Sequence, residues 1–113
     1  MVFRYSRKRV QLDHTLTSSQ DISFKISDMN THINAARGLC FHALKQINTQ
    51  CYRSTSSQAK LFDTQMVTSV AQLGLMIMGG RSYFKNDIIN LLSADARGME
   101  YLEGASSMQK MII

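Results

Sequence analysis

An apolar residue recurs every three or four positions between residues 22 and 47, and this repeat is the most regular pattern in the chain. Its members are Ile22, Ile26, Met29, Ile33, Ala36, Cys40, Ala43 and Ile47. Alternating steps of four and three place such side chains along one face of an α-helix. Leu39 and Leu44 widen that face into a band that is expected to pack against a neighbouring helix. The pattern predicts a long helix that ends near Tyr52 and Arg53.

A second helical repeat follows after a short polar stretch. Its apolar positions are Ala59, Phe62, Met66, Val70, Leu73 and Ile77. The polar residues 54–57 predict the link between the two helices, and one of their serines is expected to cap the second helix. Gly79 and Gly80 are expected to end it, because glycine is common just beyond a helix C-terminus. Two long helices joined by a short link must lie antiparallel.

The remaining segments predict shorter elements. Residues 1–9 are interpreted as the tail end of another helix, and residues 14–19 as a loop. A third helix is expected from Asn86 or Asp87 to Arg97. Its buried face is predicted to hold Ile88, Leu91 and Leu92.

The C-terminal segment predicts a turn followed by a last helix. Glu103 and Gly104 are expected to form the turn, and Ser106 to cap a helix that runs to Ile113. No segment shows the alternation typical of a β-strand. The expected fold is therefore all-α, an up-down helical bundle of four to five helices in a single domain over residues 1–113.

Composition supports long helices joined by short links. The chain contains no proline, which would otherwise break helices and mark loops. Hydrophobic residues make up 44% and charged residues 19%, both within the globular range. Eight methionines suit an adaptable helical interior.

The net charge of +5 is concentrated at the N-terminus, where Arg4, Arg7, Lys8 and Arg9 lie within nine residues. This basic run has two interpretations: a solvated helix face, or a contact to the phosphate of a nucleotide cofactor or nucleic acid. No nucleic-acid recognition motif and no series of stacking aromatics accompany it. Nucleic acid is therefore the least favoured partner.

The two cysteines and the apolar stretches bear on the compartment of the protein and on whether it binds a metal. On a single helix, Cys40 and Cys51 would lie about 16 Å apart, too far for a disulfide. A reducing compartment is expected, and no Cys or His spacing is typical of a zinc site. Residues 1–20 lack the apolar core of a secretory signal. Residues 66–80 are too few to span a bilayer and are interpreted as a buried helix.

Seven short motifs resemble, in order, the C-terminal helical domain of acyl-CoA dehydrogenases. Three of the longer ones are YSRKR at residues 5–9, QDISFKISDM at 20–29 and GGRSY at 79–83. Shorter matches are Ala36-Arg37, Ala59-Lys60 and Asp95-Ala96-Arg97. The terminal run YLEGASSMQK, residues 101–110, is similar to the family's closing motif, and the resemblance extends from about residue 5 to residue 113.

The resemblance implies a flavin-dependent oxidation of a fatty acyl-CoA thioester. Glu103 would be the base that removes the α-proton, while the β-hydrogen leaves as hydride to FAD. Arg9 would contact an FAD phosphate. Gln20 and the turn at Gly79 and Gly80 would contact the adenosine or diphosphate part of FAD from a neighbouring subunit. No metal is implied. A thioester α-proton is weakly acidic, so the base must be a carboxylate made more basic by desolvation.

The resemblance also implies a setting and a state of assembly. It predicts a homo-oligomer, a dimer or tetramer, acting in fatty acid β-oxidation. The expected location is the mitochondrial matrix in a eukaryote and the cytoplasm otherwise. The family's flavin and most of its acyl-CoA site lie in upstream domains, so the isolated 113 residues are expected to be inactive. The alternative is a non-catalytic helical module that associates with itself or with a full-length homologue.

The sequence departs from the family pattern mainly where the cofactor would lie. The departures are Leu12, Asp13, Met76, Ser82, Leu91, Ala94 and Ala105. An acid at Asp13 disfavours a neighbouring phosphate. The apolar repeats of the two long helices are intact. The fold is therefore predicted to be retained more faithfully than the cofactor contacts.

Overall fold

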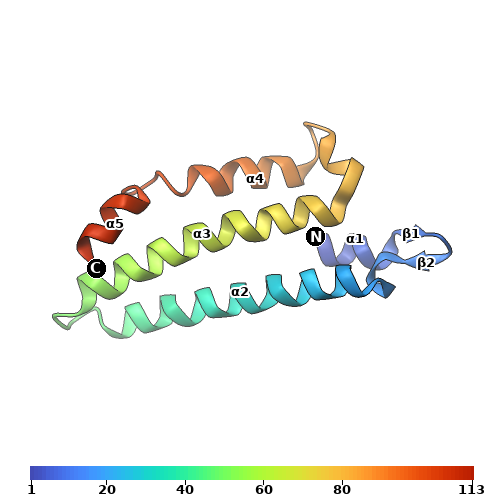
Figure 1. Ribbon diagram of the computed structural model, residues 1–113. Coiled ribbons are helices and arrows are strands. Elements are labelled where there is room, and N and C mark those ends of the chain that lie inside the picture. Colours follow the sequence, from blue (N-terminus) through green and yellow to red (C-terminus); the bar gives the residue numbers. More distant parts are fainter.

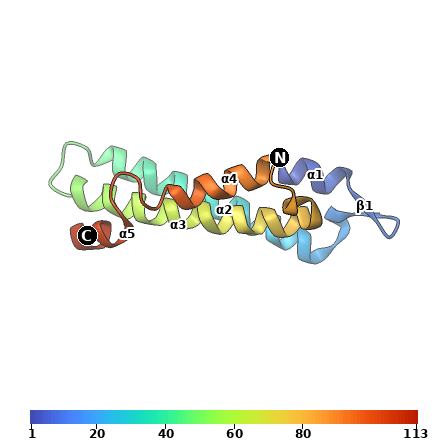
Figure 2. The same cartoon turned by 90° about the horizontal axis from the view of Figure 1, so that it is seen from above.

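Two long antiparallel helices, α2 (Gln20–Lys45) and α3 (Tyr52–Met78), form the axis of the molecule in the computed structural model, which describes residues 1–113 (Figure 1). Helix α4 (Ile88–Gly98) lies along the side of α3 opposite α2, and α5 (Ser106–Ile112) packs near the start of α3. Helix α1 (Val2–Lys8) lies against the end of α3. The molecule measures 57 × 26 × 16 Å, and its flatness is clear from above (Figure 2). The predicted all-α fold is confirmed.

The core lies where α1, α3 and α4 meet. Its buried members are Val2, Ile77, Met78 and Ile89, with half-buried residues of α2 packed around them. Packing at Gly74 is tight, because a Cβ there would lie 3.1 Å from Ile89 Cδ1 and 3.3 Å from Val2 Cγ2. A larger residue at this position would fit only if those side chains shifted.

Elsewhere the interface of the long helices is made by small residues. Ala36, Ala43 and Ala59 are buried, whereas the larger members of the predicted band are half-buried and Leu44 and Ile47 are exposed. The periodicity thus predicts both long helices and their facing sides, but the predicted end of the first near Tyr52 and Arg53 is wrong, because α2 ends at Lys45. The periodicity also overestimates how completely those sides are covered. No helix is both long enough and apolar enough to cross a membrane.

The link between the long helices spans residues 46–51, so the predicted link at 54–57 is wrong. Thr49 forms the turn by donating its backbone N–H and its hydroxyl to Gln46 O, at 2.9 and 2.8 Å. Residues 54–57 lie inside α3, where Thr55 Oγ1 donates to Cys51 O at 3.0 Å. Such back-bonding satisfies hydroxyl groups within a helix. Cys40 and Cys51 consequently lie on different elements, and both are free thiols.

A short hairpin replaces part of the predicted N-terminal loop. Strands β1 (Val10–Gln11) and β2 (His14–Thr15) are antiparallel, with Val10 opposite Thr15, and a 3-10 turn, η1 (Leu16–Ser18), follows. The connecting residues Leu12 and Asp13 both have positive φ, 51° and 62°, as in a type I′ turn. Two-residue strands are too short to show alternation, which explains why the prediction of no strand was wrong.

Helix α4 begins as predicted but shows a different face to the core. Asp87 caps it, its Oδ1 accepting from Ile89 N at 3.3 Å. The buried residues are Ile89, Ser93 and Ala96. The predicted Ile88, Leu91 and Leu92 are exposed, so that prediction is wrong. Small Ser93 and Ala96 let α4 lie close to α3, and this close approach selects the buried face.

The predicted cap at Ser106 is also wrong. Ser106 is the first residue of α5, Ala105 precedes it as N-cap, and no side chain caps that end. The Ser106 hydroxyl is buried without a hydrogen-bond partner.

Candidate functional site

The Glu103–Gly104 turn connects α4 to α5, as the sequence predicts. Glu103 has φ of +56° and Gly104 has φ of +102°. The Glu103 residue is exposed, and its carboxylate makes no hydrogen bond or ion pair. A non-glycine residue at positive φ is uncommon and is often found where function requires it.

Two side chains hold this turn by its backbone. Lys60 Nζ, from α3, donates to Met99 O at 3.1 Å and to Gly104 O at 3.2 Å. Gln109 Nε2, from α5, donates to Glu103 O at 3.3 Å. Lys60 and Gln109 fall within the matched motifs, but their contacts to the turn leave no local signal in the sequence.

A second carboxylate lies close by in the chain. Glu100 is half-buried, and its Oε1 accepts from Thr68 Oγ1 at 3.1 Å. The Thr68 hydroxyl also lies 3.4 Å from Ala96 O. Unlike Glu103, Glu100 therefore has a protein partner on α3.

The residues expected to contact a cofactor lie at the opposite end of α4. Arg9 follows α1, Gln20 begins α2, and Gly79 and Gly80 follow α3, all at one end of the bundle (Figures 1 and 2). Helix α4, with 11 residues, separates this end from Glu103 by about 16 Å along its axis. The fold brings the four predicted cofactor residues to one end and does not bring them to Glu103.

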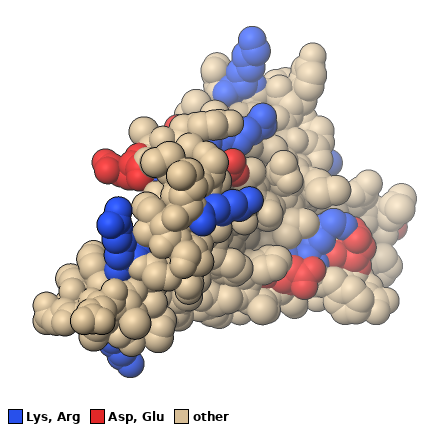
Figure 3. All heavy atoms as spheres, turned by 60° about the vertical axis from the view of Figure 1, so that its left-hand side comes forward, with Lys and Arg blue, Asp and Glu red and all other residues tan.

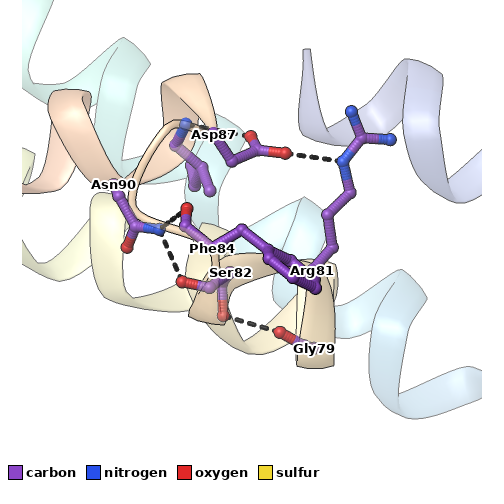
Figure 4. Close-up of polar contacts among 7 residues, drawn as sticks. Gly79, Arg81, Ser82, Phe84, Asp87 and Asn90 are labelled. Carbon is purple, nitrogen blue, oxygen red and sulfur yellow. Dashed lines mark hydrogen bonds and ion pairs between the residues drawn. The ribbon is translucent and has the colours of Figure 1, made fainter.

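The Gly79–Gly80 turn is open to its surroundings yet fixed internally. Gly79 has φ of +58°, and a Cβ at either glycine would meet nothing within 4 Å. Ser82, which replaces a family glycine, donates its hydroxyl to Gly79 O at 2.6 Å (Figure 4). Asn90 Nδ2 donates to Ser82 O at 2.6 Å and to Phe84 O at 2.7 Å. Another molecule can therefore approach this backbone without displacing a side chain.

Arg81 joins this turn to two neighbouring helices. Its Nε donates to Asp87 Oδ2 at 2.6 Å (Figure 4), and its guanidinium lies 5.6 Å from the centre of the Tyr5 ring on α1. The hydrogen bond from Arg81, with that from Ile89 N, lowers the pKa of Asp87 below 3.8. The sequence predicts a helix that begins at Asn86 or Asp87, and it gives no sign of the ion pair that Asp87 forms.

The lowered pKa of Asp87 predicts an acid-dependent loss of stability. A carboxylate whose folded pKa is depressed stabilises the fold above its unfolded pKa and loses that contribution as pH falls through the folded pKa. The contribution is thus complete above pH 3.8 and lost below it. The midpoint of thermal unfolding, measured from about pH 6 downwards, should fall less in Asp87→Asn than in the wild type, because asparagine can still cap the helix but has no carboxylate to protonate. Equal falls of the midpoint in the two proteins would contradict the role of the Asp87–Arg81 ion pair.

The structure gives little support for a reactive thiol or a metal site. Cys40 Sγ donates to Asp63 Oδ2 at 2.6 Å, and this hydrogen bond, with desolvation, raises the pKa of the Cys40 thiol to about 11. A thiol with that pKa is protonated near neutrality and is a poor nucleophile. No group of three or more His, Cys, Asp or Glu side chains is placed to hold a metal ion.

An apolar groove of about 890 Å³ runs between α1, α2, α3 and α4. Val2, Ile26, Ile33, Val70, Ile89 and Leu92 are among its lining residues. Charged side chains do not gather into one patch on the face drawn in Figure 3, where uncharged residues cover most of the surface. An apolar groove of this kind is a candidate site of contact with ligand or protein.

Comparison with known proteins yields a consistent set of matches. The model of the acyl-CoA dehydrogenase C-terminal domain matches residues 1–113. An acyl-CoA dehydrogenase of Bacillus subtilis is 34% identical over 111 residues, covering 96% of this chain and 29% of the relative. The mitochondrial short-chain specific acyl-CoA dehydrogenase of Rattus norvegicus is 30% identical, with 97% and 27% covered.

A solved structure shows the same fold. Butyryl-CoA dehydrogenase from Megasphaera elsdenii superposes with a TM-score of 0.92 at 29% identity, covering 98% of this chain and 29% of that protein. The chain thus spans less than a third of the length of these relatives. They include bacterial and mitochondrial proteins.

Proposed function

The chain belongs to the acyl-CoA dehydrogenase family as its C-terminal domain, and from this we propose that it supplies the catalytic base for α,β-dehydrogenation of a fatty acyl-CoA thioester. The family is one of flavin-dependent dehydrogenases. The observation that carries the proposal is the Glu103–Gly104 turn, which presents an unpaired carboxylate within a match covering the whole chain. The activity is proposed for a protein in which this domain acts with flavin-binding residues beyond it.

The proposed reaction gives Glu103 one task. Its carboxylate accepts the α-proton of the thioester as the carbon–carbon double bond forms. FAD, when bound, supplies the acceptor for the β-hydride, so that the substrate loses two hydrogens and the cofactor is reduced. An unpaired carboxylate suits this role, because no partner in the chain stabilises its charged form. Enclosure by substrate and neighbouring protein would raise its basicity through desolvation.

The open end of the bundle fits the cofactor contacts that we propose. Arg9 is exposed and forms no ion pair, so its guanidinium is free to bind a phosphate. Gln20 is exposed at the start of α2. The space beside Gly79 and Gly80 would admit the adenosine or diphosphate part of FAD.

The distance along α4 supports an assembly of at least two copies. The predicted cofactor residues and Glu103 lie beyond opposite ends of that helix, so the two sets would not meet at one point of a bound flavin. We propose that one copy supplies Glu103 and a neighbouring copy supplies Arg9, Gln20 and the glycine turn. The proposed location is the mitochondrial matrix in a eukaryotic cell and the cytoplasm in a bacterium.

A second candidate function is association without catalysis. The apolar groove between α1, α2, α3 and α4 favours it, because that surface would be buried by another copy or by a full-length homologue. In this case the chain would assemble and take up no flavin.

Gly80→Leu tests the cofactor contact without disturbing the chain's own packing. A Cβ at Gly80 would have no neighbour within 4 Å, so the thermal midpoint of the 113-residue chain should stay within about 2 °C. The same change in the flavin-containing protein should lower the ratio of bound FAD to protein, measured by absorbance. Unchanged FAD content in Gly80→Leu would contradict the proposed contact between the glycine turn and FAD. A wild-type protein that assembles but binds no flavin would favour the association module.

A further inference from the structure

The segment that carries Glu103 is fastened to α3 at both of its ends. Lys60 Nζ donates to Met99 O, just after α4, and to Gly104 O, just after Glu103. The two distances are 3.1 and 3.2 Å. One ammonium group therefore spans the linker of residues 99–104 and fixes it against the long central helix.

Gln109 completes the attachment from α5. It is only 8% exposed, and its Nε2 lies 3.3 Å from Glu103 O and 3.4 Å from Gly104 O. A Cβ on Gly104 would lie 2.9 Å from the same nitrogen. The positive φ favours glycine at position 104, and a Cβ there would also displace the Gln109 amide.

Neither donor touches the carboxylate of Glu103. The ion pairs in the molecule are Lys25–Asp21 and Arg81–Asp87, so the Lys60 ammonium has no carboxylate within 4.0 Å. A direct ion pair would favour the charged form of Glu103 and make it a weaker base. Attachment through backbone carbonyls holds the residue in place and avoids that direct pairing.

We propose that Lys60 is a positioning residue, which acts with Gln109 to hold the Glu103–Gly104 turn in the conformation that presents the carboxylate. The effect on turnover rests on the function proposed above. The effect on the linker is a property of the chain itself and is measurable without any substrate.

The linker is tested first in the 113-residue chain, by amide hydrogen exchange read by mass spectrometry. Its reporter amides are Tyr101 N–H, bonded to Gly98 O, and Gln109 N–H, bonded to Ala105 O. Lys60→Met should speed exchange in residues 99–109 about tenfold, the factor for a loss of roughly 1.4 kcal/mol. Lys60→Arg keeps the charge and donors and should restore slow exchange. Exposed Lys110→Met is the control and should change nothing.

The second measurement is turnover of butyryl-CoA by the flavin-loaded protein that contains the chain. Lys60→Met should lower kcat about tenfold with FAD content and KM unchanged, and Lys60→Arg should recover most of it. Linker exchange within twofold of wild type in Lys60→Met, or equal acceleration by Lys110→Met, would overturn the proposed attachment of the linker by Lys60. A loosened linker with unchanged kcat would overturn the positioning role. An inactive wild type whose linker behaves as expected would refute the proposed function alone.

Discussion

Glu103→Gln is expected to lower kcat for acyl-CoA oxidation by about 10²–10⁴-fold, the range that general base catalysis contributes. Glutamine keeps the size and polarity of the side chain and removes its ability to accept the α-proton. The side chain makes no hydrogen bond or ion pair in this chain, so folding should not change. Steady-state kinetics of the flavin-loaded protein measures the effect, and FAD content and KM should stay near their wild-type values.

The control for this prediction is the neighbouring carboxylate. Glu100 is held by the Thr68 hydroxyl and is not the proposed base. Glu100→Gln keeps an oxygen that can accept that hydrogen bond, so its kcat should lie within about threefold of wild type. A large loss of kcat in Glu100→Gln, with activity retained in Glu103→Gln, would transfer the base to Glu100.

Ile89→Ala is expected to lower the free energy of unfolding by about 2–5 kcal/mol, the range for truncating a buried isoleucine. Ile89 is 4% exposed and packs with Val2, Ile77 and Met78, which are core residues from α1 and α3. Truncation would leave a cavity at the junction of three helices. Urea unfolding of the 113-residue chain, followed by circular dichroism, measures the change.

The adjacent residue provides a matched control for the orientation of α4. Ile88 has the same side chain on the same turn but is 55% exposed. Ile88→Ala should change the free energy of unfolding by no more than about 0.5 kcal/mol. If Ile88→Ala proved the more damaging of the two, the buried face expected from the sequence would be correct and the structural assignment wrong.

The long helices were predictable because their patterns repeat many times. A run of alternating three- and four-residue steps leaves no competing structure, and a short link then requires antiparallel packing. The link itself was misplaced because serine and threonine suit both turns and helices. Thr55 and Ser56 satisfy their hydroxyls on the carbonyls of the preceding turn.

The orientation of α4 was not predictable from hydrophobicity alone. Ile88 and Ile89 are equivalent in the sequence, and Leu91 and Leu92 favour the face that is in fact exposed. Helix α4 instead packs through Ser93 and Ala96, whose small size allows close approach and which a hydrophobic pattern ranks low. Contacts between distant elements decide such cases.

Part of the candidate site was also predictable from the sequence, and part of it was not. The motif around Glu103 identified the turn, since glycine at positive φ is readable from sequence. Lys60 and Gln109 hold that turn from other helices, 44 and 5 residues from Gly104, and their hydrogen bonds depend on the assembled fold. The assignments of Glu103, Arg9, Gln20, Gly79 and Gly80 to chemistry and cofactor stay predictions.

One measurement tests the central claim most directly: anaerobic mixing of butyryl-CoA with the flavin-loaded protein, wild type and Glu103→Gln, followed by the absorbance of oxidised flavin. We predict rapid loss of that absorbance in the wild type. The Glu103→Gln protein, with the same FAD content, should lose it at least about 10²-fold more slowly. Equal rates in the two proteins would contradict Glu103 as the base, and a flavin-loaded wild type that no acyl-CoA reduces would contradict the dehydrogenase function itself.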